Sequence, residues 1–192
     1  HGAAVCLVGK TVVILQCASG LSPYSMTTNT NSNSFTPPAP KVAEGDKTPA
    51  AIALGWLHTA KFLTTAPELR FLPPLDLPEI AFVGRSNAGK STCINTLTQQ
   101  KQLAYASKKP GRTQHINLFA LGKQGVTDAI LTDLPGYGYA AVPKQDKIRW
   151  QQVMANYLIT RENLTGIVLM CDPRRGLTEL DAILLDGIRP RV

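Results

Sequence analysis

The sequence predicts an α/β fold, a three-layer sandwich in which a mixed, mostly parallel sheet lies between helices. An apolar run at residues 79–83 leads through a glycine-rich turn into a helical pattern at residues 91–99, the order of a strand–loop–helix unit. A near-continuous apolar run at residues 165–171 is typical of a central parallel strand. Between them, residues 114–121 and 126–134 predict two strands joined by a turn, an antiparallel hairpin.

Composition limits the class of protein. The 192 residues are enough for one ordinary domain and a tail. With 20 Lys and Arg against 13 Asp and Glu, the formal charge is +7, which favours a polyanionic partner such as RNA, although a solubility feature is the alternative. Cys93 and Cys171 stand in core-like runs and no Cys-x-x-Cys pair occurs, so we expect reduced thiols in a cytoplasmic protein.

The first 47 residues differ from the rest. Residues 3–20 are apolar but are interrupted by Lys10 and Gln16 and lack a basic start, so we expect neither a signal peptide nor a membrane span. Because the first methionine is Met26, we expect residues 1–25 to be translated upstream sequence, with a β-hairpin appendage as the alternative. Residues 27–46 are rich in Thr, Asn, Ser and Pro, which predicts disorder. Residues 1–47 are thus expected to be a disordered or non-native extension.

Residues 48–77 are predicted to form an N-terminal helix and a connection to the main domain. Thr48 followed by Pro49 is a typical helix start. Helical spacing then predicts one helix over residues 50–65 that packs on the outside of the domain. Its apolar positions are Ile52, Trp56, Ala60 and Leu63.

The glycine-rich turn has the pattern Gly-x-x-x-x-Gly-Lys-[Ser/Thr] of a phosphate-binding loop. Its glycines permit turns that a Cβ would block, so that backbone N–H groups face inward around a polyphosphate at a helix start. Its lysine supplies positive charge for the β- and γ-phosphates, and its serine is a hard oxygen ligand suited to Mg²⁺. A chance Gly-Lys-Ser turn is the alternative, which the flanking strand and helix disfavour. The residues are Gly84, Arg85, Ser86, Asn87, Ala88, Gly89, Lys90 and Ser91.

A second motif follows the predicted hairpin, in the order Asp133, Leu134, Pro135 and Gly136. An Asp that leaves a strand beside a phosphate loop can hold Mg²⁺ through water, while the glycine N–H meets the γ-phosphate. Alone, Asp-x-x-Gly is usually a turn, but downstream of a Lys-Ser phosphate loop it indicates a nucleotide switch. Residues 99–113, between the two motifs, contain cations and no acid, and are predicted to be a mobile loop.

The C-terminal part continues the α/β pattern. Residues 144–160 predict a helix, and residues 172–176 form a loop at the end of the parallel strand, where open α/β sheets place function. Thr178 is a candidate cap for a last helix with Leu180, Ile183 and Leu184 as its apolar stripe. His58 and His115 lack metal-type neighbours, so we expect no histidine metal site.

These motifs, in this order, closely resemble the EngB (YihA/YsxC) family of bacterial GTPases. The resemblance rests on residues 84–91, on 107–115, on Asp133-Leu-Pro-Gly-Tyr-Gly-Tyr-Ala and on 161–164, and it covers roughly residues 78–185. It implies hydrolysis of GTP to GDP with Mg²⁺ on a Ras-like P-loop fold. It also implies a cytoplasmic role in assembling the large ribosomal subunit, contact with ribosomal RNA, and a need in cell division and septation. We expect a monomer that contacts neither membranes nor DNA.

The resemblance also assigns residues. It identifies residues 84–91 with the phosphate loop, Ser91 with an Mg²⁺ ligand, and Thr113 with the switch threonine that reaches Mg²⁺ when the γ-phosphate is present. Residues expected to line the nucleotide are Gly111, Arg112, Thr113, Gln114 and His115, with Asp133, Leu134, Pro135 and Gly136 as the second switch. Those expected to take part in hydrolysis are Lys90, Thr113, Asp133 and Gly136.

The sequence departs from the family after its last helix. The guanine-reading motif [Asn/Thr]-Lys-x-Asp should follow a further strand, and that strand is absent; residues 144–146 begin a helix and lack an apolar strand before them. We therefore expect a partial domain at residues 78–192, incomplete at the C-terminus, with an open sheet edge, an uncovered core and an aberrant end at 188–192. A non-catalytic fragment that binds RNA or protein partners without guanine specificity is the alternative function. A P-loop ATPase or small-molecule kinase is a more distant one.

Three further expectations concern mechanism. Tyr137 stands where many GTPases have a Gln that orients the attacking water, which predicts slow turnover and stimulation by another element. One candidate for that element is K⁺ held partly by Asn87. The alternative is that Asn87 hydrogen-bonds only the loop backbone. Tyr137 and Tyr139 are expected to pack in the loop rather than stack on bases. A cationic patch is expected to contact RNA phosphates, with a solvated loop as the alternative. It comprises Lys101, Lys108, Lys109, Arg112, Arg174 and Arg175.

Overall fold

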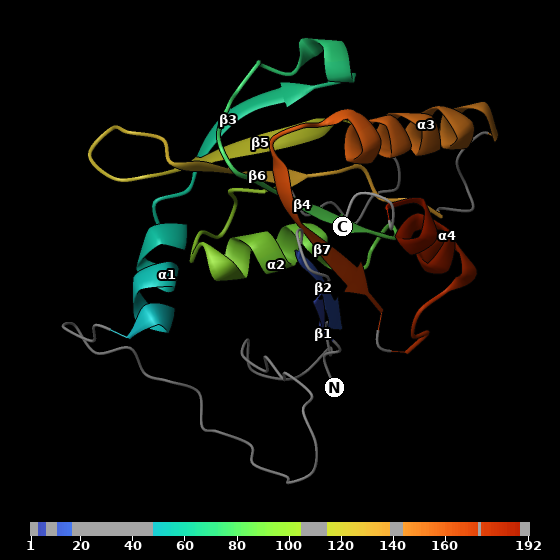
Figure 1. Ribbon diagram of the computed structural model, residues 1–192. Helices are drawn as coiled ribbons and strands as arrows, with labels where there is room; N and C mark the ends of the chain where they lie inside the picture. The colour runs from blue at the N-terminus through green and yellow to red at the C-terminus, as the bar shows by residue number, and fades with distance from the viewer. Residues whose placement is uncertain are drawn as a thin grey trace, which may run out of the picture.

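A seven-stranded sheet forms the centre of the molecule, with the strand order β1-β2-β7-β4-β6-β5-β3 (Figure 1). This computed structural model describes residues 4–6, 11–16, 48–104, 115–138, 144–172 and 174–188. The strands are β1 Ala4–Cys6, β2 Thr11–Gln16, β3 Lys61–Ala66, β4 Glu79–Gly84, β5 Ile116–Leu121, β6 Ala129–Asp133 and β7 Leu164–Cys171. The helices are α1 Pro49–Leu57, the 3-10 turn η1 Leu69–Phe71, α2 Lys90–Leu97, α3 Lys144–Thr160 and α4 Glu179–Ile188.

The sheet is mixed and mostly parallel, as predicted. Strands β2, β7, β4 and β6 pair in parallel, whereas β1 on β2, β5 on β6 and β3 on β5 pair antiparallel. Because β5 is antiparallel to β6 and β3 is antiparallel to β5, β3 runs in the same direction as β4 and β6. Of the described strands, β1 and β5 run in the opposite direction. The carboxyl ends of β4, β6 and β7 therefore share one edge of the sheet, the edge at which such folds bind ligands.

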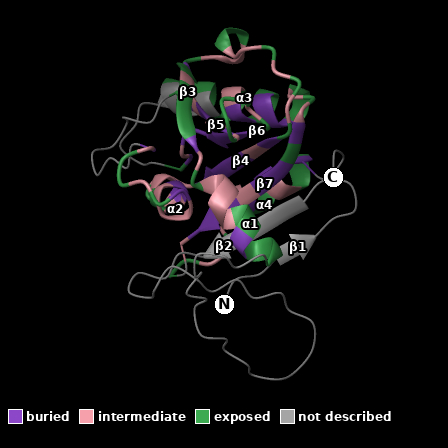
Figure 2. Cartoon of the chain, turned by 90° about the vertical axis from the view of Figure 1, so that its left-hand side faces the viewer, coloured by how far each residue is buried: buried purple, intermediate pink, exposed green. Residues whose placement is uncertain are grey.

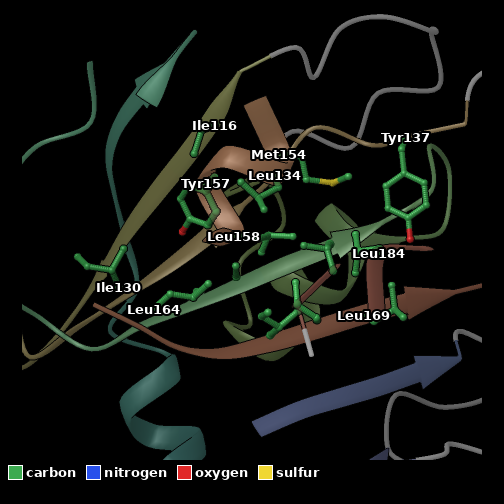
Figure 3. Close-up of a cluster of buried hydrophobic side chains, with 14 of the residues drawn as sticks. Ile116, Ile130, Leu134, Tyr137, Met154, Tyr157, Leu158, Leu164, Leu169 and Leu184 are labelled. Atoms are coloured by element: carbon green, nitrogen blue, oxygen red, sulfur yellow. The ribbon is translucent and has the colours of Figure 1, made fainter. Parts of the chain in front are cut away.

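Helices cover both faces of the sheet, which confirms the three layers. Side chains alternate along β4 because successive residues of a strand point to opposite faces. Ala81 and Val83 pack in the cluster that α3 and α4 cover, and Phe82 packs in the cluster that α1 and α2 cover. Figure 2 shows the buried residues concentrated along the central strands, and Figure 3 shows the α3–α4 cluster in detail.

The predicted helix over residues 50–65 is wrong in its second half. Helix α1 starts at the predicted cap, where Thr48 Oγ1 accepts from the N–H of Ala51 at 3.3 Å, but it ends at Leu57. The hydroxyl of Thr59 then donates to the carbonyl of Trp56 and accepts from the N–H of Gly122, which closes a turn. The next residues form β3 on the edge of the sheet. Pairing with β5 overrides the helical spacing of the side chains.

The described part of the N-terminal segment contains a hairpin, which was the alternative for residues 1–25: β1 pairs antiparallel with β2. That residues 1–25 are translated upstream sequence stays a prediction, because strand pairing does not test their origin. Strand β2 pairs with β7 along six residues, from Thr11 opposite Gly166 to Gln16 opposite Cys171. The edge of β7 that was expected to be open is thus covered. Residues 17–47 lie outside the described part of the chain.

The other predicted elements form with small shifts. Strands β5 and β6 are the expected antiparallel hairpin, and α3 has the expected bounds. The stripe expected on α4 is partly wrong, because Ile183 is 60% exposed whereas Leu184 and Ile188 are buried. Leu180 packs against the core as expected, and Asp181 is also buried on this face, one turn before Leu184.

A buried carboxylate fixes the amino end of β4. Glu79 is 0% exposed, and its Oε1 accepts from the hydroxyl of Thr132 at 2.7 Å and from the hydroxyl of Tyr157. Its Oε2 accepts from Arg161 Nε at 2.9 Å and Asn163 Nδ2 at 3.0 Å. Four donors thus satisfy this charge and join β4, β6 and the α3–β7 connection.

Candidate nucleotide-binding site

Strand β4 delivers the glycine-rich loop to the carboxyl edge of the sheet, and α2 starts directly after it. At Gly84, a Cβ would lie 2.5 Å from the carbonyl oxygen of Met170 in β7, so no side chain fits there. Gly89 has φ +92°, a left-handed conformation that favours glycine, and it is the N-cap of α2. The two motif glycines thus have separate roles, close approach at the first and chain reversal at the second.

The loop presents backbone N–H groups at the start of α2. The first intrahelical bond runs from the N–H of Cys93 to the carbonyl of Gly89 at 2.8 Å, so the N–H groups of Lys90, Ser91 and Thr92 have no partner within the helix. Together with the positive end of the helix dipole they form an anion site. Asn87 at the loop tip has φ +65° and an exposed side chain.

Lys90 carries a buried ammonium group beside this anion site. Its side chain is 7% exposed, and Nζ donates to the carbonyl of Gly84 at 3.3 Å, which leaves two N–H donors for a ligand. Burial lowers the pKa of Lys90, against the opposing effect of the Asp133 carboxylate. A polyanion at the loop would reverse this effect of burial by stabilising the charged ammonium.

Asp133 and Ser91 supply hard oxygen atoms next to this lysine. Ser91 Oγ donates to Asp133 Oδ2 at 2.9 Å, and Asp133 Oδ1 is buried without a hydrogen-bond partner among the described residues. Burial raises the pKa of Asp133, and the charge of Lys90 and the Ser91 bond oppose the rise. A buried acceptor left unpaired in a native fold requires an explanation. A hydroxyl and a carboxylate are donors that Mg²⁺ prefers, so the residues fit this ion.

The Asp-x-x-Gly segment packs directly on the phosphate loop. A Cβ on Gly136 would lie 2.8 Å from Ser86 Cα and 3.0 Å from Lys90 Nζ, so only glycine fits there. Leu134 is buried, and its N–H donates to the carbonyl of Phe82 at 3.1 Å. Both predicted motifs, from β4 and from β6, therefore meet at one place.

Tyr137 is buried, so its ring is not available to stack on a base, and it packs in the cluster covered by α3 and α4 rather than within the loop. Its phenol donates to Asp181 Oδ1 on α4. Sequence reasoning missed Asp181 as a residue near the site. The available signal was the pattern from Thr178 to Asp181, in which a threonine precedes an acid by three residues at a helix start.

The remaining predicted site residues are not brought to the loop by the described structure. His115 is described and exposed, one residue before β5. Gly111, Arg112, Thr113 and Gln114 lie outside the described residues, as do Lys108, Lys109 and Tyr139. Of the cationic patch, Lys101 and Arg175 are exposed. Arg174 donates to both carboxylate oxygens of Asp172, at 2.9 and 2.8 Å, so a neighbour offsets its charge.

Comparisons with known proteins identify the family. A family model described as 50S ribosome-binding GTPase matches residues 79–191. The chain is 88% identical over 141 residues to a probable GTP-binding protein EngB of Albidiferax ferrireducens. The matched region covers 73% of this chain and 68% of that relative. The chain is 76% identical over 153 residues to the protein of the same description from Polaromonas sp., covering 80% of this chain and 62% of that relative.

A solved structure is also similar. The crystal structure of a probable GTP-binding protein engB matches with 26% identity and a TM-score of 0.44, covering 58% of this chain and 64% of that one. The chain thus spans about two thirds of the length of the proteins it matches. None of the helices in the described ranges has the length and apolar character required to cross a bilayer.

Proposed function

Because the chain belongs to the EngB family of GTP-binding proteins, we propose that it binds GTP and hydrolyses it to GDP and phosphate with Mg²⁺. The observation that carries this proposal is the pairing of Ser91 with Asp133, whose second oxygen is buried and unpartnered within the described residues, next to the buried ammonium of Lys90. A fold keeps such uncompensated groups together where a charged ligand completes them.

The proposed Mg²⁺ ligands are few. Ser91 would bind the ion through its hydroxyl, and Asp133 would hold it through water; Thr113 is the further ligand expected from the family resemblance. The ion, when bound, neutralises the charge on the β- and γ-phosphate oxygens. The unpaired Oδ1 of Asp133 supports this assignment, because it is an acceptor without a donor in the described structure.

The chain's own residues position and neutralise the phosphates. Lys90 and the N–H groups at the start of α2 would hold the β- and γ-phosphates, and the Gly136 N–H would approach the γ-phosphate. Tyr137 is committed to Asp181 through its phenol, so it is not free to orient the attacking water. We therefore propose slow intrinsic hydrolysis that another element stimulates.

Potassium is the proposed stimulating ion, with Asn87 as part of its site. The side chain of Asn87 is exposed at the loop tip, which supports this proposal, and a side chain that only hydrogen-bonds the loop backbone is the alternative. Turnover measured at equal ionic strength is expected to be faster in KCl than in NaCl. Equal rates in the two salts would remove potassium from the proposal.

The proposed cellular role is assembly of the large ribosomal subunit in the cytoplasm, with a requirement in normal cell division and septation. The family description as 50S ribosome-binding and the net charge of +7 support a ribosomal RNA partner. Co-sedimentation with large subunits is expected to be stronger with a non-hydrolysable GTP analogue than with GDP and to weaken as salt rises. Binding that ignores both nucleotide and salt would contradict this role.

The alternative is a protein that binds phosphates or partners without reading guanine, because no described residue is assigned to the base. Titration calorimetry of the 192-residue chain with Mg²⁺ separates the two functions. We expect GDP and GTP to bind and ADP to bind far more weakly. Lys90→Ala should abolish binding, whereas Lys123→Ala, an exposed lysine at the opposite edge of the sheet, should not. Equal affinity for ADP would favour the alternative, and no binding of any nucleotide would refute the proposal.

A further inference from the structure

Resting on the proposed GTP binding, we propose that Asp181 of α4 is a positioning residue. By accepting a hydrogen bond from Tyr137, it holds Gly136 against the phosphate loop, and so increases affinity for GTP relative to GDP. Among the described residues, Asp181 hydrogen-bonds with Tyr137 and Thr178, so it acts on Gly136 through the tyrosine.

The backbone of Tyr137 joins the two loops. Its carbonyl accepts from the N–H of Ser86 at 2.8 Å, its N–H donates to the carbonyl of Gly84 at 3.4 Å, and it forms a parallel bridge with Arg85. The preceding residue is Gly136, which the close approach to Ser86 holds without space for a side chain. Any shift of Tyr137 therefore moves Gly136 relative to the phosphate loop.

The tyrosine ring is held from the side of α4. Asp181 is 1% exposed, and its Oδ2 accepts from both the N–H and the hydroxyl of Thr178 at 2.7 Å. Its Oδ1 is left for the phenol of Tyr137, so every oxygen of the carboxylate has a donor. Burial raises the pKa of Tyr137, and the hydrogen bond and charge of Asp181 raise it further. The phenol thus remains a donor throughout the physiological pH range.

Selectivity for GTP over GDP follows because Gly136 is expected to contact the γ-phosphate. GDP has no γ-phosphate, so its binding uses the phosphate loop and Lys90 but does not need the Gly136 N–H. GTP needs that N–H in place, and a loosened segment must be ordered when GTP binds. Loss of the Tyr137–Asp181 contact is therefore expected to lower the affinity for GTP and to leave the affinity for GDP nearly unchanged.

The molecule contains a matched control for this contact. Tyr157 on α3 also donates its phenol to a fully buried carboxylate, that of Glu79, but at the amino end of β4, away from the phosphate loop. Figure 3 shows the two tyrosines well apart within the same buried cluster. Tyr137→Phe and Tyr157→Phe remove the same hydroxyl from the same kind of buried pair, and each leaves a ring that can still pack.

The test compares GTP-analogue and GDP affinities in Tyr137→Phe, Asp181→Asn and the double variant. Each single variant is expected to lower the affinity for the analogue relative to GDP by about tenfold, because Tyr137→Phe removes the donor of a hydrogen bond to a charged acceptor and Asp181→Asn removes the charge of that acceptor. The double variant should show no more than one such loss, since both changes act on one contact. Hydrogen exchange at residues 133–138 should quicken in all three without nucleotide, and Tyr157→Phe should change neither readout.

The outcomes separate this inference from the proposed function. If the unmodified chain binds both nucleotides but Tyr137→Phe weakens them equally, or additively with Asp181→Asn, the contact is only structural and the inference is wrong. If the unmodified chain binds no guanine nucleotide, the proposed function fails. In that case hydrogen exchange at residues 133–138 still tests the positioning role. Exchange that is unchanged in Tyr137→Phe and Asp181→Asn would overturn this role, and faster exchange would support the Tyr137–Asp181 contact as the one that holds the segment.

Discussion

Buried charges of different kinds lie near the two ends of β4. At the amino end, Glu79 accepts from four donors, two on each oxygen. At the carboxyl end, Asp133 accepts from Ser91 with one oxygen while the other is unpartnered in the described structure, and Lys90 donates to a single carbonyl at 3.3 Å. One end is complete within the fold, and the other is kept incomplete.

This difference separates charges that support the fold from charges that support a ligand. A buried charge with all its partners adds rigidity, and removing one partner is strongly destabilising. A buried charge without partners lowers stability unless a ligand completes it. Burial alone would rank Glu79, Lys90 and Asp133 together. The count of satisfied donors and acceptors divides them, so substitutions at the two ends should differ in kind.

The largest expected effect is on stability at the amino end. Glu79→Ala removes the carboxylate that accepts from the guanidinium of Arg161 and from three other donors. The free energy of unfolding should fall by about 3–5 kcal/mol, measured by urea denaturation. Below the unfolding transition, nucleotide affinity should change little, because the site lies at the other end of the strand.

The control for this substitution is Glu68→Ala. Glu68 pairs with Arg70 and Arg149, whose side chains are 72% and 58% exposed. Solvent screens such pairs, so the loss should stay below about 1 kcal/mol. A loss at Glu79 as small as that at Glu68 would mean that the buried network does not support the fold.

The next effect is on binding at the carboxyl end. Asp133→Asn removes the charge expected to hold Mg²⁺ but keeps an acceptor for Ser91. The Mg²⁺-dependent part of GTP affinity should fall by roughly 100-fold, a loss typical of residues that orient metal ligands. Calorimetry at several Mg²⁺ concentrations measures it, with Asp128→Asn in the connection before β6 as the control. An unchanged Mg²⁺ dependence would place the ion elsewhere.

The contrast between the two ends also explains what the sequence revealed. The phosphate loop and Asp133 were predictable because their chemistry needs fixed residue types at fixed spacing beside a strand. The network around Glu79 was not, because its partners lie 53 to 84 residues away along the chain and any polar pair of suitable length would serve. The contact of Asp181 with the site was missed for the same reason: the pattern from Thr178 to Asp181 indicates only a helix start, and the partner Tyr137 is 44 residues away.

Errors in the secondary structure have a related cause. Ala60 belongs to a helical spacing in the sequence and is indeed buried against the face that α1 and α2 cover. The chain reaches that place through a turn at Thr59 and then enters β3. Apolar residues that all face the core can belong to one helix or to a helix followed by a strand, and their spacing alone does not distinguish the two. Only pairing with β5 decides, and that is a tertiary contact.

A smaller effect tests whether the incomplete end lowers stability. The double variant Lys90→Met/Asp133→Asn removes both buried charges and keeps side chains of similar size. Its free energy of unfolding without ligand should be at least that of the unmodified chain, and higher by up to about 1 kcal/mol, because a buried charge that is incompletely partnered lowers stability and its neutral replacement does not. Urea denaturation without nucleotide measures this. A large loss would show that the pair supports the fold, as Glu79 is expected to do.

The smallest expected effect belongs to a charge pair that is complete but exposed. Arg174 forms two side-chain hydrogen bonds with Asp172, which lower the pKa of Asp172 to about 2. A depressed carboxyl pKa adds stability above the unfolded-state value of about 3.9, and this contribution is lost as the pH falls through about 2. At pH 7, Asp172→Asn should lower the melting temperature by less than about 2 °C, because the guanidinium is in solvent. The difference should shrink as the pH falls from 4 toward 2. A larger drop at pH 7, or one that persists at pH 2, would mean that satisfied partners stabilise this protein regardless of burial, and the contrast between the ends of β4 would lose its physical basis.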